Sequence, residues 1–263
     1  MSQPRPNPLH YLRATLFWLA FTMTTIVYVV PLGILVKALP KSWPYPIARS
    51  WAVVNLWALR LICGLRWRVR GLENVPDEPV IVFSKHQSTW ETLGLAMLLP
   101  PQVWVIKREL LKIPLFGWGF ASVQPIAIDR SAGRAAVEQM VDQGQARLAD
   151  GRFVIIFPEG TRVRPGQQTR YKMGGAVLAV RSGRPVLPVA HNAGEFWPRG
   201  SFVKWPGCLD VVIGEPIPTA GKTAEQINRE AGAAIEGMMA EISGRGPAAA
   251  APSNAGGQAQ RHA

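Results

Sequence analysis

The stretch VIVFSKHQSTWE, residues 80–91, joins an apolar run directly to titratable side chains. Its first four residues are apolar and three of them are β-branched, which is typical of a strand buried in a sheet. Lys85, His86 and Glu91 follow at once. In open α/β sheets the ligand crevice lies beyond the carboxyl ends of the strands. The stretch therefore predicts a sheet strand that leads into one wall of a binding site.

Three further apolar runs end in the same way, at positions 106, 128 and 157. The polar residues that follow them are Lys107 and Arg108, Asp129 and Arg130, and Glu159, Thr161 and Arg162. Because the carboxyl ends of parallel strands lie at one edge of a sheet, these residues and His86 are expected to meet there.

The rest of the chain repeats this alternation of apolar runs and helical stretches. Strands are predicted at residues 67–70, 80–83, 103–106, 123–128, 153–157, 186–190 and 209–213. Helices are predicted at residues 89–99, 132–149, 172–181 and 223–243. Strands rich in Val and Ile between amphipathic helices favour an α/β fold, a mixed, largely parallel sheet flanked by helices. A chain of 263 residues is long enough for one such domain with an appendage.

The N-terminal region is suited to a membrane. No charged residue occurs between positions 16 and 36, so this segment can cross a bilayer if it is wholly helical, although Pro31 interrupts it. Residues 46–65 carry Trp51 and Trp57 together with Arg49 and Arg60, the mixture that an interfacial helix uses. We predict a membrane-embedded helical hairpin within residues 1–65, dipping into one leaflet. The alternative is one transmembrane span followed by a core helix.

The charge and the cysteine content of the chain limit the classes of binding partner and the cellular location. The formal net charge of +12 favours an anionic partner, which can be nucleic acid, an acidic membrane leaflet or an acidic substrate. Nucleic acid is disfavoured because the basic residues are spread over membrane-like segments and strand ends, without a recognisable nucleic-acid module. Cys63 and Cys208 have no close cysteine or histidine neighbour, and the histidines lack metal-ligand spacing. The sequence therefore predicts no disulfide and no metal, and a reducing, cytosol-facing location.

His86 and Glu91 form a candidate catalytic pair. An imidazole titrates near neutral pH and suits a general base that takes a proton from a hydroxyl. A carboxylate that accepts the proton of one ring nitrogen leaves the other nitrogen as the base. Five residues on an ideal helix rotate by about 500°, so the pairing requires His86 to lie in a turn before the helix, capped by Ser88 or Thr89. Alone, a histidine five residues before a glutamate is weak evidence, because in most sequences such a spacing is due to chance.

The stretch FPEGTR, residues 157–162, is a candidate anion site. Its Pro and Gly permit a tight turn, and Arg162 can bind a phosphate bidentately with help from exposed backbone amides. Glu159 beside a phosphate would be repulsive, so we expect it to orient Arg162 or to bind an acceptor hydroxyl. The alternative is a surface turn with solvated charges.

Taken together, the two stretches resemble the glycerolipid acyltransferase family. Residues 86–91 resemble its first sequence block and residues 157–162 its third. Residues 105–130 are similar to the second block and residues 186–190 to the fourth, so the resemblance covers roughly residues 65–215. It implies an acyltransferase domain, which we place at residues 66–243. The remaining residues, 244–263, are low in bulky apolar groups and are predicted to be a disordered tail.

The resemblance also implies a reaction and a site. His86, paired with Glu91, would deprotonate the 2-hydroxyl of lysophosphatidic acid, which attacks the thioester of acyl-CoA or acyl-carrier protein to give phosphatidic acid for phospholipid synthesis. The implied substrate-binding residues are Lys107, Arg108 and Arg162 for the phosphate, and Glu159, Gly160 and Thr161 for the shape of the site. The thioester is a co-substrate, and no cofactor is expected. Membrane phospholipid is the expected partner, at the cytoplasmic side of the inner membrane.

Two alternatives remain open. The family's usual carboxylate in the first block is aspartate, and Glu91 in its place leaves room for another lyso-lipid acceptor. The chain can also be a membrane phospholipid-binding protein without catalysis, which does not require His86. No Gly-x-Ser-x-Gly elbow occurs and Cys208 has no evident activating base, so a covalent acyl-enzyme is not indicated. His191 is expected to be a packed or hydrogen-bonded residue.

Overall fold

The fold is built on one seven-stranded sheet. The computed structural model describes residues 4–35, 44–113 and 116–247. The strands are β1 (Leu65–Arg70), β2 (Ile81–Ser84), β3 (Gln102–Lys107), β4 (Ile126–Ile128), β5 (Phe153–Ile156), β6 (Val186–His191) and β7 (Gly207–Ile213). Their order is β1-β7-β6-β2-β5-β3-β4, and every neighbouring pair is parallel except β6 and β7. The predicted mixed, largely parallel sheet is confirmed.

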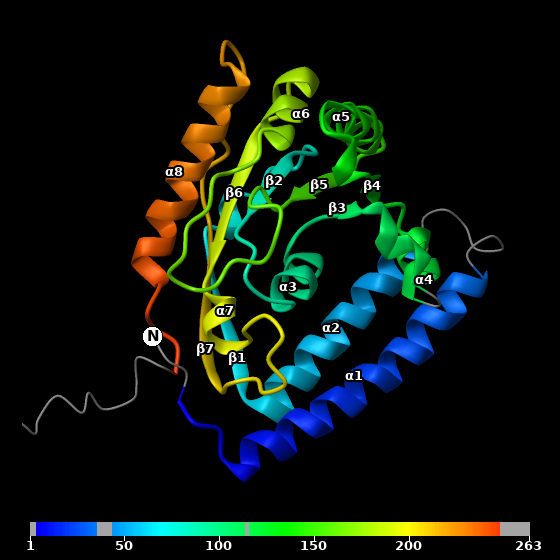
Figure 1. Ribbon diagram of the computed structural model, residues 1–263, viewed down its shortest axis with the longest axis vertical. Coiled ribbons are helices and arrows are strands. Elements are labelled where there is room, and N and C mark those ends of the chain that lie inside the picture. The colour runs from blue at the N-terminus through cyan, green and yellow to red at the C-terminus, as the bar shows by residue number, and fades with distance from the viewer. Residues whose placement is uncertain (1–3, 36–43, 114–115, 248–263) are drawn as a thin grey trace, which may run out of the picture.

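Helices cover both faces of this sheet (Figure 1). They are α1 (Pro8–Leu35), α2 (Pro44–Cys63), α3 (Trp90–Leu98), α4 (Phe116–Ser122), α5 (Arg134–Ala149), α6 (Gly174–Ser182), α7 (Ala193–Phe196) and α8 (Ala224–Ile242). Short 3-10 turns lie at η1 (Leu72–Asn74), η2 (Arg108–Lys112) and η3 (Arg130–Ala132). The sequence did not predict α4 or α7, because each is too short to show a helical period.

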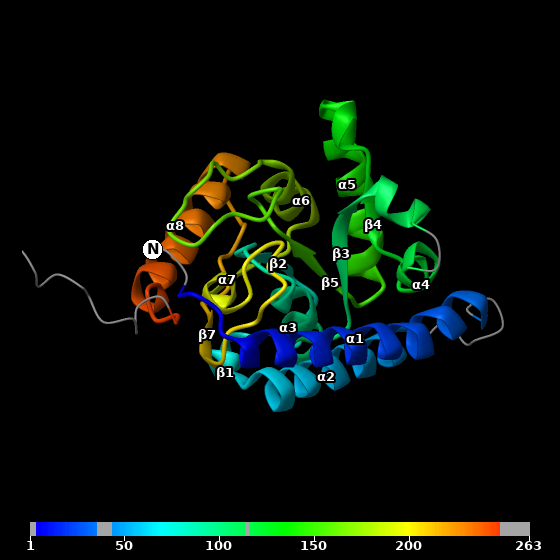
Figure 2. The same ribbon diagram turned by 60° about the horizontal axis from the view of Figure 1, so that its bottom comes forward.

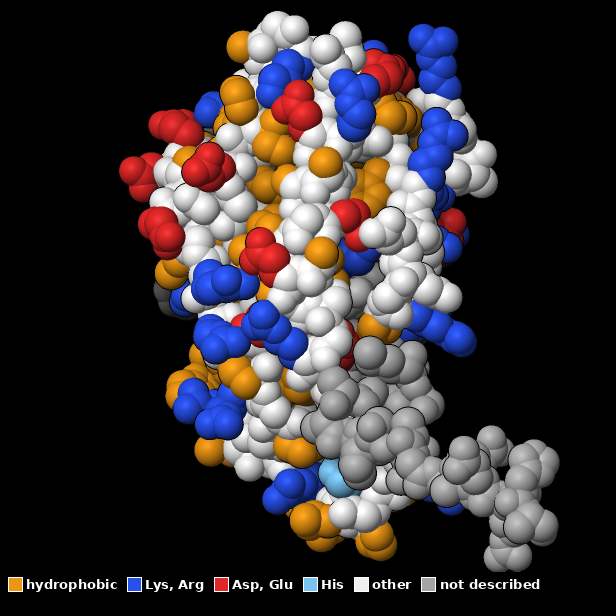
Figure 3. All heavy atoms as spheres, turned by 90° about the vertical axis from the view of Figure 1, so that its left-hand side faces the viewer, with side chains coloured by type: hydrophobic (Ala, Val, Ile, Leu, Met, Phe, Trp, Pro, Cys, Tyr) orange, Lys and Arg blue, Asp and Glu red, His pale blue; other side chains and the backbone are white. Residues whose placement is uncertain are grey.

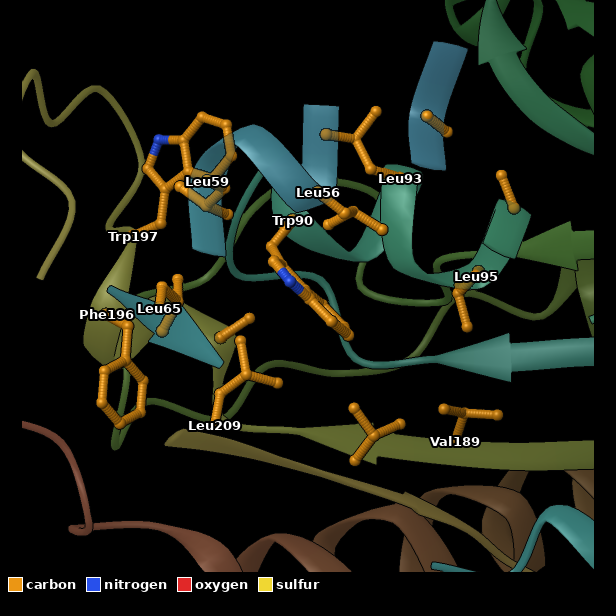
Figure 4. Close-up of a cluster of buried hydrophobic side chains, with 14 of the residues drawn as sticks. Leu56, Leu59, Leu65, Trp90, Leu93, Leu95, Val189, Phe196, Trp197 and Leu209 are labelled. Atoms are coloured by element: carbon orange, nitrogen blue, oxygen red, sulfur yellow. The ribbon is translucent and has the colours of Figure 1, made fainter. Parts of the chain in front are cut away.

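The strand β2 shows why this sequence folds into layers. Side chains on a strand alternate between the two faces of its sheet. Val82 joins the apolar core beneath α1, α2 and α3, whereas Ile81 and Phe83 join the core beneath α5, α6 and α8. Figure 4 shows the core beneath α1, α2 and α3. There the indole of Trp90 lies between Leu56 of α2 and Leu209 of β7. The unbroken apolar run thus reflects burial on both faces.

The first two helices lie side by side along one flank of the domain (Figure 2). Towards one end of α1, the indole N–H of Trp18 donates to the Phe202 carbonyl at 3.2 Å. Towards its other end, Val29 packs directly on Gly119 of α4. The outer face of α1 exposes large apolar residues, namely Leu9, Tyr11, Leu12, Leu16, Leu19, Met23, Ile26, Val27, Ile34 and Leu35. By length and composition α1 can cross a membrane.

The helical hairpin was predicted within residues 1–65, and α1 and α2 occupy that region. Pro31 lies inside α1 without ending it. The predicted tail of residues 244–263 falls mostly outside the described residues, because the structure describes only 244–247 of it.

Candidate active site

The carboxyl ends of β2, β3, β4 and β5 meet at one edge of the sheet. These strands are parallel neighbours, with Phe83 opposite Ile156 and Lys107 opposite Ile128. A cavity of about 760 Å³ opens beyond this edge. Of the predicted site residues, those that line it are His86, Lys107, Gly160, Thr161 and Arg162. The convergence that the sequence predicted therefore occurs.

His86 lies in the loop between β2 and α3, as the pairing with Glu91 requires. Its Nδ1 is 2.8 Å from Oε1 of Glu91, which is in the first turn of α3. The backbone N–H groups of Gln87 and Ser88 also donate to the Glu91 carboxylate, at 2.9–3.0 Å. The Ser88 hydroxyl accepts the backbone N–H of Trp90, whereas the side chain of Thr89 makes no cap. The loop thus folds around one buried carboxylate.

This environment fixes the ionisation of Glu91. Burial would raise its pKa, but the hydrogen bond with His86, the nearby histidines and the N–H of Ser88 together lower the pKa below its usual range. An ionised Glu91 accepts the Nδ1 proton of His86, so Nε2 is left as the basic nitrogen. The His86 ring also stacks on Phe157, with ring centroids 4.0 Å apart and planes 12° from parallel. Both contacts hold the imidazole at the wall of the cavity.

The turn at residues 157–162 lies beside this imidazole. Gly160 has φ +70°, a left-handed conformation that other residues rarely adopt, and its N–H donates to the Phe157 carbonyl at 2.9 Å. The N–H of Val163 donates to the His86 carbonyl at 2.8 Å, so the turn and the histidine loop are directly joined. A guanidinium N–H of Arg130 donates to the Gly160 carbonyl.

Arg162 lines the cavity with an unused donor. Its Nε is buried and has no hydrogen-bond partner among the described residues. A buried donor without a partner is costly and rare in native proteins, which points to a ligand that supplies the acceptor. Lys107, Arg130, Lys172 and Arg199 line the same cavity. Among the described residues no carboxylate joins these cations in the lining, which suits the binding of a phosphate.

Two of the predicted substrate-binding residues, Glu159 and Arg108, lie outside the cavity lining. The side chain of Glu159 is fully buried and accepts the backbone N–H of His86 at 2.7 Å, while its other oxygen lies 2.7 Å from Nζ of Lys85. Glu159 therefore supports the histidine loop from behind. Arg108 begins η2 and donates to Oε1 of Gln139 in α5 at 2.9 Å. Neither is part of the lining, and their contacts with a substrate stay predictions.

Among the described residues, four lining cations had no predicted substrate-binding role, namely Arg49, Arg130, Lys172 and Arg199. Arg130 follows the β4 strand, and this position is why the sequence placed it at the same edge of the sheet, although it was given no role in binding. Arg49 lies on α2 and donates to the Met97 carbonyl at 3.0 Å. Lys172 and Arg199 come from loops, where no periodic pattern marks which side chains face inward. Lys172 packs over Gly160 so closely that a Cβ at position 160 would lie 2.9 Å from its Nζ.

The other limb of the cavity is mostly apolar. Residues of α1, α2, α3 and α4 line it, including Phe21, Leu32, Trp51, Leu93, Ala96 and Phe120. Residues 115–120 form a stretch rich in Gly and aromatic residues, of which Gly119 and Phe120 line the cavity. Trp118 is half exposed, and Leu115 lies outside the described residues. An apolar limb that joins a cationic end is suited to an amphipathic ligand.

His191, the other histidine near the site, has a structural role. His191 is fully buried, with Nε2 2.8 Å from the Lys85 carbonyl and Nδ1 accepting the N–H of Ala193. It is a packed, hydrogen-bonded residue, as its sequence context predicted. Within the described ranges, no group of three or more His, Cys, Asp or Glu residues is arranged to hold a metal ion.

The length of Glu91 is expected to matter for the base. In Glu91→Asp the carboxylate retreats by one C–C bond, about 1.5 Å, and cannot reach both His86 and the two backbone N–H groups. We expect kcat to fall roughly tenfold with little change in KM, because the imidazole is misplaced while the anion site is intact. Steady-state kinetics of the purified variant test this, with exposed Glu225→Asp in α8 as control. Unchanged kcat in Glu91→Asp would contradict it.

Comparison with known proteins identifies relatives of this chain. A family model described as Acyltransferase matches residues 66–192. The 1-acyl-sn-glycerol-3-phosphate acyltransferase of Pseudomonas aeruginosa is 42% identical over 236 residues, which cover 88% of this chain and 92% of that protein. Human 1-acyl-sn-glycerol-3-phosphate acyltransferase alpha is 31% identical over 194 residues, covering 70% and 69%.

A solved structure shares the fold. The crystal structure of the 1-acyl-sn-glycerophosphate acyltransferase from Thermotoga maritima matches with a TM-score of 0.73 and 24% identity, over 89% of this chain and 97% of that one. The identity to the Pseudomonas protein, over nearly the whole length of both chains, decides the family. This chain belongs to the 1-acyl-sn-glycerol-3-phosphate acyltransferase family.

Proposed function

We propose that the protein transfers a fatty acyl group from a thioester donor to the 2-hydroxyl of lysophosphatidic acid, giving phosphatidic acid. The observation that carries this proposal is one cavity lined both by His86, which is paired with the buried Glu91, and by Arg162, whose Nε has no partner among the described residues. The apolar limb between α1, α2 and α3 suits the acyl chains.

The reaction follows from the geometry. Arg162, with Lys107, Arg130 and Lys172, binds the acceptor phosphate and directs the glycerol hydroxyl towards Nε2 of His86. His86 takes the hydroxyl proton as the oxygen attacks the thioester carbonyl, and Glu91 stabilises the imidazolium that forms. The C–S bond then breaks, and the departing thiolate takes the proton from His86. The products are phosphatidic acid and the free thiol of coenzyme A or of acyl-carrier protein.

An acceptor panel tests the proposal. Purified protein is given labelled acyl-CoA or acyl-carrier protein with lysophosphatidic acid, lysophosphatidylethanolamine, lysophosphatidylcholine, a lyso-aminolipid or monoacylglycerol. We expect the highest kcat/KM with lysophosphatidic acid, and a product acylated at the 2-position. Activity restricted to acceptors that lack a phosphomonoester would contradict the proposal. A protein that binds these lipids without acylating any of them would point to the non-catalytic alternative.

We further propose that α1 and α2 are immersed in one leaflet, with the catalytic domain on the cytoplasmic side of the inner membrane. The exposed apolar face of α1 supports immersion. The contacts of α1 with the domain from Trp18 to Val29 favour a helix lying along the protein over one that crosses the bilayer alone. The free thiols of Cys63 and Cys208 suit a reducing compartment.

Immersion predicts a specific loss of membrane binding. Leu19 on α1 is 60% exposed, and Leu19→Glu replaces a lipid-facing apolar side chain with a carboxylate. Because burying a leucine is worth about 1.5–3 kcal/mol, we expect vesicle affinity to fall roughly tenfold. Flotation with vesicles of phosphatidylethanolamine and phosphatidylglycerol measures it. Leu72→Glu, at a 49% exposed site in η1, is the matched control. Equal losses for both variants would contradict an immersed α1.

A further inference from the structure

A buried polar network lies behind the active-site wall. Lys85 is 1% exposed, and its Nζ lies 2.7 Å from Oε1 of Glu159 and 2.8 Å from Oε1 of Glu236. The Tyr171 hydroxyl donates to the same Glu236 oxygen at 3.1 Å. Glu159 also accepts the backbone N–H of His86. Four side chains from distant parts of the sequence thus form one connected cluster, which we call the Lys85 network (Lys85, Glu159, Tyr171 and Glu236).

Three members of the Lys85 network each precede a cavity-lining residue in the chain. Lys85 precedes His86, Glu159 precedes Gly160, and Tyr171 precedes Lys172. The base, the turn and one lining cation are therefore attached to the same buried cluster. A displacement of this cluster changes the distance between the imidazole and the phosphate-binding groups.

Glu236 is the one member of the Lys85 network that lies outside the region matched by the family model. It lies on α8, outside residues 66–192, to which the family model matches. The α8 helix starts with a capping box formed by Thr223 and Gln226 and buries Ile227, Ala231 and Ile235 against the sheet. Figure 3 views the side of the molecule on which α8 lies, where acidic and basic side chains both reach the surface. Glu236 instead turns inward, and its side chain is only 24% exposed.

The charges of the network explain why its geometry is fixed. Burial would lower the pKa of Lys85, but the hydrogen bonds and charges of Glu159 and Glu236 together raise it above its ordinary value. Lys85 is therefore an ammonium ion held between the carboxyl groups of Glu159 and Glu236, and burial raises the pKa of Glu159 although the contact with Lys85 opposes that shift. Removing one partner from a buried ion pair leaves its charge uncompensated, and the remaining groups must then move or change ionisation.

We propose that Glu236 is a positioning residue for acyl transfer. It holds Lys85 and Tyr171, and through them it sets the spacing between the imidazole of His86 and the phosphate-binding turn. This inference rests on the proposed function, because the spacing matters only if both groups act on one acceptor. It makes α8 part of the catalytic apparatus although no residue of α8 lines the cavity among the described residues.

Three variants of α8 separate positioning from general stability. Glu236→Ala removes the acceptor of both hydrogen bonds, whereas in Glu236→Gln the amide oxygen can still accept from Lys85 and Tyr171. Glu241→Ala is the control on the same helix, because the Glu241 side chain is 62% exposed and makes only a 3.6 Å ion pair with Arg70. Kinetics are measured with lysophosphatidic acid and a thioester donor, well below each melting temperature. Binding of lysophosphatidic acid is measured by calorimetry without donor.

We expect Glu236→Ala to lower kcat/KM roughly tenfold, since small displacements of reacting groups have effects of this size. The loss should appear both in kcat, through His86, and in a weaker Kd for the acceptor, through Lys172 and the turn. Glu236→Gln should restore both to within about threefold of wild type, and Glu241→Ala should match wild type. If Glu236→Ala is poorly folded, Tyr171→Phe, which removes one hydroxyl, should weaken acceptor binding by a few-fold.

Different results would overturn the positioning role of Glu236 and the proposed function. Equal kcat and equal acceptor Kd in Glu236→Ala and wild type would overturn the positioning role. A loss that follows only the folded fraction of each variant would overturn it too. Wild-type protein that acylates no acceptor would contradict the proposed function instead. The donor-free binding measurement still tests the network in that case, because unchanged lysophosphatidic acid binding in Glu236→Ala contradicts it.

Discussion

Replacing His86 with alanine is expected to lower kcat by roughly 10³-fold, within the range that general base catalysis contributes. The imidazole is the one histidine that lines the cavity among the described residues, and its Nδ1 is committed to Glu91. Without it the acceptor hydroxyl must lose its proton to water as it attacks the thioester. The measurement is single-turnover and steady-state acyl transfer to lysophosphatidic acid by purified His86→Ala.

The reason for the loss can be checked independently. Lysophosphatidic acid should bind His86→Ala with nearly wild-type affinity, because the cations of the phosphate site are unchanged. Adding imidazole to the assay should restore part of the rate, since the substitution leaves a space beside Phe157. A variant that retains kcat within a few-fold of wild type would show that another group is the base.

The second large effect is expected for Arg162→Ala, with kcat/KM for lysophosphatidic acid lowered roughly 10²-fold. Hydrogen bonds to charged groups contribute about 1.5–3 kcal/mol each, and the phosphate loses a partly buried donor group. Most of the loss should appear as a higher KM, because the phosphate is bound alike in the ground state and the transition state. Initial rates over a range of acceptor concentrations separate KM from kcat.

Arg164→Ala is the matched control for this variant. Arg164 lies two residues further along, is exposed and is not part of the cavity lining. The Arg164→Ala substitution removes the same charge from the same loop but no lining group. The kcat/KM of this variant should therefore stay within about twofold of wild type. Equal losses in the two variants would mean that the general positive potential, and not a specific contact of Arg162, attracts the acceptor.

The centre of the sheet was predictable because β2, β5 and β6 are buried on both faces. Runs such as residues 80–83 and 153–157 are continuously apolar, and each of the seven predicted strands corresponds to one in the structure. The antiparallel pairing of β6 and β7 was not specified by any pattern, because pairing direction depends on how the intervening loop returns. The termini of the helices differ from the predictions by one or two residues at most positions.

The site was predictable where functional residues follow strands. Lys107 ends β3, and His86 and Arg162 lie in the loops that follow β2 and β5, so the parallel arrangement of these strands brings the three residues together. Glu159 also follows a strand, but its side chain turns towards Lys85 and not into the cavity, which strand position alone cannot tell. Glu236 is a polar residue in an amphipathic helix, and its sequence context is that of a solvated side chain. Only the packing of α8 shows that it points inward.

The proposed mechanism requires the imidazole of His86 and the guanidinium of Arg162 to act on one lipid molecule. It is tested by a crystal structure of the wild-type protein with lysophosphatidic acid bound and no acyl donor present. We predict the phosphate at hydrogen-bond distance from Nε of Arg162, and the 2-hydroxyl about 3 Å from Nε2 of His86. A phosphate bound away from Arg162, or a 2-hydroxyl directed away from His86 into solvent, would contradict the account.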